Sequence, residues 1–328
     1  EVALAYLEQL AATIRSDGRQ KKYDCVIGVS GGVDSTMVAY TVKKLGLRPL
    51  AVHLDNGWDA ELAVSNIEKT LNKLGIDLLT HVIDWEEFRD LQLSFFKASV
   101  ANVEVLTDHA IMAILFKTAA RNSIKYVISG GNVVTEAIMP QSWMYDSRDL
   151  RHIAAIHEKY GSVPLRTLPH CSLLEYFYYI FIRRIKYVPV LNYISYKKDD
   201  AKKLIEKELD WRDYGGKHYE SIFTRFFQAY YLPEKFKIDK RRAHLSTLLC
   251  SGQITRDDAM KEMERPAYSP ELFQQDLEFF IKKMKLSREE WDCIMALPVR
   301  TYKDYPSNRF IFRINPWIIR WIKYIVKP

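Results

Sequence analysis

A twelve-residue stretch, DCVIGVSGGVDS at positions 24–35, constrains the fold of this chain more than any other part of it. Cys25 to Val29 is a short apolar run of strand-forming residues, and from Thr36 onward apolar side chains recur with helical spacing. Gly31 and Gly32 between them allow the backbone to approach a ligand closely. A strand, a tight turn and a helix N-terminus in this order predict an anion site, because amide N–H groups and the helix dipole hold negative charge there.

Three side chains of this turn suit a bound phosphate. Ser30 and Ser35 can add hydroxyl donors. Asp34 would repel the phosphate by itself, and a bridging Mg²⁺, which prefers hard oxygen ligands, explains its presence. Paired glycines after a strand are common in structural turns, so the pattern indicates a nucleotide phosphate site only together with these residues.

Apolar strands alternate with amphipathic helices over the first half of the chain. Further strands are predicted at 49–55, 78–83, 126–129 and 188–194, and the segment 107–109 is predicted to cap a helix that continues to Ala120. This alternation is typical of an α/β fold with a doubly wound, mostly parallel sheet, in which ligands bind at the carboxyl ends of the strands. Asp55 and Gly130 follow two of these strands and are therefore expected on the ligand side.

The pattern divides the chain into three parts. Residues 1–22 form an N-terminal helix and linker, residues 23–210 form the α/β domain, and residues 211–328 form a helical C-terminal domain. Residues 140–187 interrupt the alternation and are interpreted as an insertion near the active site. Helix starts are predicted at Thr255, Ser269 and Ser287.

Charge and cysteine content limit the partners and the compartment. The net charge is +7, with 15 Lys+Arg and 19 Asp+Glu in residues 1–150 and therefore 33 and 22 in the remainder. The basic half could face a nucleotide, a nucleotide-linked sugar, an anionic lipid or RNA, or could be a solvated surface. Four isolated cysteines, no signal peptide and no apolar run long enough to span a bilayer favour a cytoplasmic protein.

The string SGGVDS resembles the pyrophosphatase loop (PP-loop) of the ATP pyrophosphatases, whose domain is of the adenine nucleotide alpha hydrolase type. The resemblance implies that ATP is cleaved between its α and β phosphates. It also implies that the end of the second strand and the glycines after a later strand surround the adenosine. The residues assigned to ATP on this basis are Ser30, Gly31, Gly32, Asp34, Ser35, Val52, His53, Asp55, Gly130, Gly131 and Asn132.

A closer resemblance extends over essentially the whole chain. The segment WRDYGGKHYESIFTRFFQ at 211–228, together with HLDNGWD, TDHA and GGNVVTEAIMPQSW, is similar to the N-acetyl sugar amidotransferase family of O-antigen and pseudaminic or legionaminic acid pathways. The resemblance implies that an acetamido group on an activated, nucleotide-linked sugar becomes an acetamidino group. Adenylation of the amide oxygen followed by attack of ammonia would accomplish this, since an unactivated amide resists ammonia.

We assign provisional roles to the polar residues around these motifs. Lys217 and Arg225 are expected to neutralise the departing pyrophosphate, as cationic groups do in phosphoryl transfer. The residues expected to bind the sugar or its nucleotide are Asp108, Glu136, Arg148, Arg151, His152, Tyr214, His218 and Glu220.

The same resemblance suggests partners. No cysteine has the setting of a glutaminase nucleophile, so ammonia is expected from a glutaminase subunit through a barrel subunit, both similar to those of histidine biosynthesis. Family members usually begin with cysteine pairs that this chain lacks, so Zn²⁺ is expected only in a segment outside it. The segment 317–327 is expected to dock on a partner, contact the inner membrane or pack on its own domain. The alternative function is a tRNA-modifying PP-loop enzyme, although no nucleic acid is expected among the partners.

Overall fold

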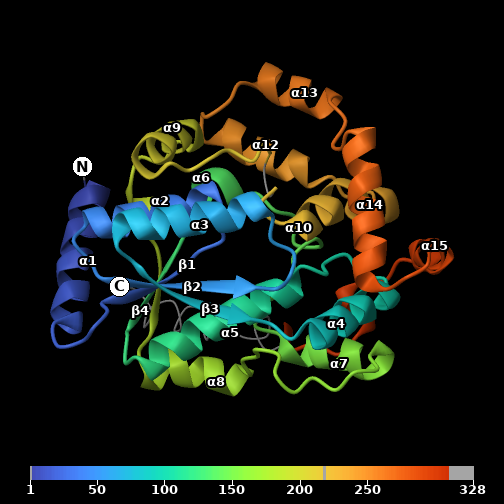
Figure 1. Cartoon of the computed structure of the whole chain (residues 1–328), viewed down its shortest axis with the longest axis horizontal. Helices are drawn as coiled ribbons and strands as arrows, with labels where there is room; N and C mark the ends of the chain where they lie inside the picture. Colours follow the sequence, from blue (N-terminus) through green and yellow to red (C-terminus); the bar gives the residue numbers. More distant parts are fainter. Residues whose placement is uncertain (1, 217–218, 310–328) are drawn as a thin grey trace.

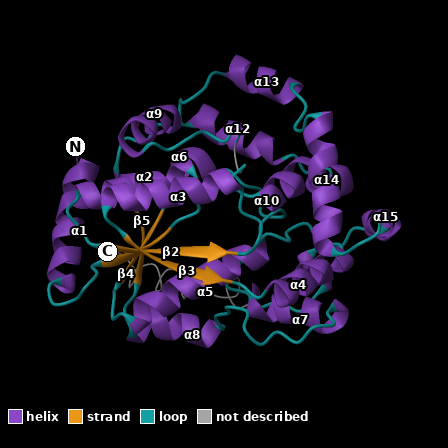
Figure 2. Cartoon of the chain, in the orientation of Figure 1, coloured by secondary structure: helices purple, strands orange, loops and turns teal. Residues whose placement is uncertain are grey.

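A five-stranded parallel sheet forms the centre of the computed structural model, which describes residues 2–216 and 219–309 (Figures 1 and 2). Its strand order is β3-β2-β1-β4-β5. The strands are β1 (Cys25–Gly28), β2 (Pro49–Asp55), β3 (Asp77–Val82), β4 (Tyr126–Ser129) and β5 (Lys186–Pro189). The doubly wound parallel sheet predicted from the sequence is confirmed. The order reverses at β1, so the crevice between the carboxyl ends of β1 and β4 is the expected ligand position.

Helices cover both faces of the sheet (Figure 2). One face is covered by α1 (Val2–Gly18), α2 (Val33–Lys44), α3 (Glu61–Leu74) and α9 (Lys198–Leu209). The other is covered by α4 (Trp85–Ala98), α5 (Val105–Arg121), α7 (Leu150–Tyr160) and α8 (Leu173–Phe177). Because β1 is covered on both sides, Cys25, Val26 and Ile27 are fully buried, which explains its uninterrupted apolar sequence.

The strand predicted at 78–83 lies one residue earlier, and two other predicted elements differ from the structure by two residues or more. The last strand was predicted at 188–194 but lies at Lys186–Pro189, where the amide of Lys186 donates to the carbonyl of Lys125 over 2.7 Å. Its chain then turns into a 3₁₀ helix, Val190–Tyr193. The helix predicted to be capped at 107–109 begins at Val105, because the Asn102 side chain accepts from the Val105 amide.

The C-terminal helices lie beyond the end of the sheet toward which β2 and β3 point (Figure 1). They are α10 (Ile222–Phe226), α11 (Leu232–Phe236), α12 (Lys240–Cys250), α13 (Arg256–Glu264), α14 (Pro270–Met284) and α15 (Arg288–Ala296), and α6 (Val133–Glu136) lies against α12. The predicted starts at Thr255, Ser269 and Ser287 are confirmed as side-chain caps.

Aromatic side chains join these helices to the α/β core. The rings of Phe226 and Phe280 lie 4.5 Å apart, and Phe96 of α4 packs edge-on against Trp291 at 5.3 Å. All four are at most 1% exposed. Phe226 and its aromatic neighbours therefore serve core packing, and one apolar cluster spans residues of both predicted domains.

The segment 140–187 is anchored to α5 through His109. Its Nδ1 lies 2.6 Å from the carbonyl oxygen of Ser147, and its Nε2 accepts from the amide of Cys171. The ring therefore carries its proton on Nδ1 and donates it to that carbonyl. These two contacts fix the segment beside the first turns of α5, at the edge of the sheet where the candidate site lies.

Candidate functional site

The predicted phosphate loop closes on itself through its two serines. The Ser30 and Ser35 hydroxyls lie 3.2 Å apart, and Ser35 Oγ also donates to the carbonyl of Gly32 over 3.1 Å. Gly31 adopts φ +76°, and a Cβ there would lie 2.3 Å from the carbonyl oxygen of Ala63. Only glycine therefore fits this position, which brings the loop tightly against α3.

Residues distant in sequence hold the loop in place. Trp211 is 1% exposed, and its indole N–H donates to the carbonyl of Gly31 over 2.9 Å. The hydroxyl of Tyr196 donates a short hydrogen bond to Asp34 Oδ1. A Cβ on Gly130 would lie 3.3 Å from the backbone carbon of Asp34, so the turn after β4 also approaches the loop closely. The loop is thus fixed before any ligand arrives.

A cavity of about 230 Å³ opens beside the loop. Its wall includes Asp34, Glu136, Lys198, Tyr214 and Glu220. Among the described residues, no three His, Cys, Asp or Glu side chains converge to hold a metal ion by themselves. Mg²⁺ commonly takes only one or two carboxylates and completes its shell with phosphates and water. Asp34 beside a phosphate loop fits that donor set.

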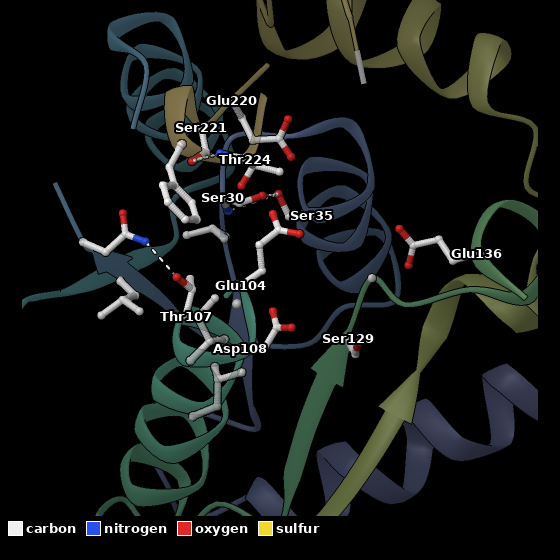
Figure 3. Close-up of a pocket in the computed structure, with 18 of the residues that line it drawn as sticks. Ser30, Ser35, Glu104, Thr107, Asp108, Ser129, Glu136, Glu220, Ser221 and Thr224 are labelled. Carbon is white, nitrogen blue, oxygen red and sulfur yellow. Dashed lines mark hydrogen bonds between the residues drawn. The ribbon is translucent and has the colours of Figure 1, made fainter. Parts of the chain in front are cut away.

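A larger cavity of about 640 Å³ continues from the loop across the carboxyl ends of β1, β2 and β4. Its sheet side is apolar and suits a flat aromatic base, with Val29, Val52, Leu54, Ile114, Leu115 and Ile128 in the wall. Its far side is polar. Figure 3 shows Glu104, Asp108, Ser129, Glu136 and Glu220 around this space.

His53 also lines the larger cavity. Its Nδ1 lies 3.0 Å from the carbonyl oxygen of Val29, and its Nε2 lies 3.4 Å from Asp59. Burial by itself would lower the pKa of His53, but Asp59, the Val29 carbonyl and the charge of Asp55 together outweigh burial and raise it. The surroundings of His53 therefore favour the protonated form of its imidazole beside the cavity.

The C-terminal region contributes directly to the cavity. Asp59 and Ser221 form an isolated antiparallel bridge. On either side of it, the amide of Ala60 donates to the carbonyl of Glu220, and the amide of Ile222 donates to the carbonyl of Trp58. This pairing places Glu220, Ser221 and Thr224 in the wall opposite α5 (Figure 3).

The structure brings about half of the sequence-predicted site residues together. The members that line one or both cavities are Ser30, Gly32, Asp34, Ser35, Val52, His53, Asp108, Gly130, Glu136, Tyr214 and Glu220. Gly31 lines neither cavity and lies against the backbone of Ala63 in α3. Asp55, Gly131 and Asn132 line neither cavity: the Asp55 carboxylate accepts from the amide of Gly57, and Asn132 caps α6. Lys217 and His218 lie outside the described residues.

Four predicted site residues have structural positions instead. Arg225 forms two hydrogen bonds of 2.7 Å with Asp276, away from both cavities. Arg148 is engaged by Asp146, and His152 is buried in α7 with its ring against Phe95. Arg151 is exposed on α7. Charge and proximity to a motif suggested these residues, but carboxylates hold Arg148 and Arg225, core packing holds His152, and Arg151 is exposed to solvent.

Sequence reasoning missed four charged residues of the cavities, one of which is Asp59 in the wall of the larger cavity. Glu104 and Lys240 pair at 2.9 Å in the wall of the larger cavity, and Lys198 lines the smaller one. Lys198 had a usable signal, since it starts the helix that follows the last strand. Glu104 and Lys240 are 136 residues apart, and nothing in the sequence joins them.

None of the described helices is long and apolar enough to cross a membrane. The NAD synthase family matches residues 6–159, and the family described as "LPS biosynthesis protein WbpG-like, C-terminal domain" matches residues 220–319. The comparison with curated proteins finds no match.

Similar solved structures have low sequence identity. An NMN synthetase from Francisella tularensis is 15% identical, with 86% of this chain and 96% of that chain covered and a TM-score of 0.42. An NH3-dependent NAD synthetase from Campylobacter jejuni is 14% identical, with 80% of this chain and 96% of that chain covered and a TM-score of 0.39. A predicted subunit of a tRNA methyltransferase from Methanocaldococcus jannaschii is 17% identical over 55% and 74%, with a TM-score of 0.32.

Proposed function

We propose that the chain converts the acetamido group of an activated sugar to an acetamidino group. The proposal is supported by the combination of an NAD-synthase-like PP-loop region with a WbpG-like C-terminal domain, which is of the N-acetyl sugar amidotransferase type. The proposed reaction consumes ATP and ammonia and releases AMP and pyrophosphate. The product enters a bacterial surface polysaccharide such as the lipopolysaccharide O-antigen, or a nonulosonic acid such as pseudaminic acid.

One observation supports this proposal above the others. The WbpG-like segment supplies Glu220, Ser221 and Thr224 to the same cavity whose other wall is the phosphate loop. A family linked to lipopolysaccharide therefore shapes the space where an acceptor would meet ATP. Two aromatic side chains that line the cavity, Trp143 and Tyr145, suit a sugar ring.

The residues of the chain have distinct tasks in the proposed mechanism. The backbone of the loop and the hydroxyls of Ser30 and Ser35 bind the phosphates, and the Lys198 ammonium lies where it can attract the departing pyrophosphate. Asp34 would hold Mg²⁺, which when bound neutralises phosphate charge. The fixed loop positions the α-phosphate for attack by the amide oxygen, which replaces pyrophosphate and leaves AMP on the amide.

A ligand screen followed by product analysis tests the proposal. Thermal unfolding is measured with ATP, Mg²⁺ and each of a set of UDP- and CMP-linked acetamido sugars. A sugar at 100 times its Kd stabilises the folded state by about 2.7 kcal/mol. The stabilising sugar is then incubated with ATP and ammonium chloride, and the product is examined by mass spectrometry for replacement of oxygen by NH. Binding without AMP release or this replacement would contradict the proposal.

The tRNA-modifying alternative rests on the basic second half of the chain, and the two functions predict different behaviour on purification. A tRNA enzyme would copurify with RNA and show a raised 260/280 nm absorbance ratio, which high salt would abolish because backbone contacts are salt-sensitive. We expect an RNA-free protein. In this proposal the predicted glutaminase and barrel partners supply the ammonia. The predicted membrane contact through 317–327 involves residues that lie outside the described structure.

A further inference from the structure

The polar wall of the larger cavity carries an unusual amount of negative charge for a site that binds ATP. Glu104, Asp108 and Glu136 all line it. Figure 3 shows Glu104 and Asp108 at the start of α5 with their carboxylates turned into the cavity and Glu136 across from them. Lys240 and His53 line the same cavity, but no ion pair joins either of them to the Asp108 carboxylate, so this part of the wall suits a cationic group on the substrate side.

The carboxylates of Glu104 and Asp108 differ in their partners. Glu104 is held by the Lys240 ammonium at 2.9 Å and by the Gln228 amide at 3.1 Å. The carboxylate of Asp108, four residues later, has no hydrogen bond or ion pair to any described residue, and its side chain is accessible from the cavity. Glu104 is therefore engaged, whereas Asp108 presents its carboxylate to whatever occupies the cavity.

The proposed reaction creates a cation at this place. The acceptor amide and ammonia are neutral, and the amidine product is a strong base that carries a proton at neutral pH. When ammonia adds to the adenylated amide carbon, a C–N bond forms, the π electron pair of the C=N bond moves onto the sugar nitrogen, and the ammonia nitrogen becomes positively charged. That nitrogen must lose a proton before the C–O bond to AMP breaks, or ammonia leaves again.

Resting on the proposed function, we propose that the Asp108 carboxylate is the general base that takes this proton. The nitrogen lone pair then expels AMP, whose oxygen carries away the electron pair of the broken C–O bond. The proton on Asp108 is returned to solvent through the cavity. Glu104 and Glu136 favour the positive charge that develops beside Asp108.

The electrostatics around Asp108 fit this task. Desolvation by the protein that surrounds the cavity and the like charge of Glu104 raise the pKa of Asp108 to about 7, although Lys240 opposes the rise and Glu136 adds to it. Solvent in the cavity reaches the Asp108 side chain, while the surrounding protein still raises its pKa by desolvation. A base with a pKa near the working pH accepts a proton more effectively than an ordinary aspartate.

Other titratable groups face the same space. Tyr187 of β5 and His244 of α12 line the cavity, and the charge of Asp108 contributes to the raised pKa of Tyr187, after burial as the main cause. Tyr187 stays protonated near neutral pH because its pKa is raised, and His244 comes from α12, whereas Asp108 lies beside Glu104 on α5. Asp108 is thus the carboxylate best placed for the proton.

Asp108→Asn tests the role, because it keeps the shape and removes the base. Sugar-dependent exchange of labelled pyrophosphate into ATP measures adenylation and belongs to the proposed function. Amidine formation per unit of free ammonia measures the second step. We expect exchange within threefold of wild type, amidine formation reduced about 100-fold or more, and loss of the decline that wild type shows below pH 7. Hydroxylamine, a less basic nucleophile whose proton passes readily to water, should partly rescue the variant.

A role limited to binding the sugar hydroxyls gives a different result. Exchange and amidine formation would then fall together, the pH profile would keep its shape, and hydroxylamine would not rescue. Any of these outcomes overturns the proposal.

A titration without substrate provides an independent check. In protein labelled at the aspartate carboxyl carbons, one NMR signal should titrate near pH 7, vanish in Asp108→Asn and move to lower pH in Glu104→Gln. The control Asp257→Asn, on the exposed side of α13, should leave that signal unchanged. The absence of any aspartate that titrates above pH 6 would contradict the proposal.

Discussion

Replacement of Arg225 separates a structural role from a catalytic one. Its guanidinium forms two hydrogen bonds of 2.7 Å with Asp276, to which Tyr268 also donates, and it lies 4.9 Å above the ring of Tyr219. The side chains of Arg225 and Asp276 are 14% and 7% exposed. Arg225→Met keeps the aliphatic volume but leaves the Asp276 carboxylate in a largely dry position with one donor.

The expected cost follows from the chemistry of the pair. Breaking a buried ion pair by removing one partner destabilises a protein by about 3–5 kcal/mol, mainly through the charge that stays behind. Because this pair retains some solvent contact and Tyr268 remains, we expect about 3 kcal/mol. Arg225→Met with Asp276→Leu removes both charges and should recover most of the loss, since no buried charge is left unpaired.

Urea unfolding followed by tryptophan fluorescence measures the loss, and sugar-dependent pyrophosphate exchange at a temperature where both variants are folded measures catalysis. We expect a lower unfolding midpoint for the single variant, a recovered midpoint for the double variant, and exchange within threefold of wild type for both. A single variant with wild-type stability and exchange lowered 100-fold would show that Arg225 acts on the nucleotide and would refute this reasoning.

Three further predictions concern the loop, the thiols and the source of ammonia. Asp34→Asn should unfold like wild type in the absence of nucleotide but lose Mg²⁺-dependent pyrophosphate release, and unchanged release would remove Asp34 from the mechanism. A chromogenic thiol reagent should modify the exposed Cys250 and Cys293 quickly, whereas Cys25 and Cys171 should react only after unfolding. Both of these are fully buried, and burial raises the pKa of both thiols, that of Cys171 to about 11. Fast reaction of all four thiols in the folded protein would contradict this packing. The isolated chain should form product from ammonium salts, faster at alkaline pH where more ammonia is unprotonated, and none from glutamine; turnover with glutamine would show that the chain carries its own glutaminase chemistry.

Local sequence patterns were sufficient for most of the fold. The strand β2 lies at the predicted residues, and the phosphate loop forms between β1 and α2 as predicted. Such elements depend on the alternation of apolar residues, on glycine in positions with positive φ and on side-chain caps within a few residues, all of which are visible in a short window. The start of α5 was missed although its signal is also local, since the Asn102 side chain accepts from the Val105 amide three residues later.

The composition of the site was decided by tertiary structure. Arg225 and Lys240 are both cations of the C-terminal region, yet Arg225 meets Asp276 outside the cavities and Lys240 meets Glu104 inside the larger one. Periodicity shows which face of a helix is buried, but it carries no information about which charges meet across the fold. Whether a charged side chain binds a ligand, pairs with a neighbour or titrates near neutral pH depends on the groups and the solvent within a few ångströms of it, and only the folded chain brings these together.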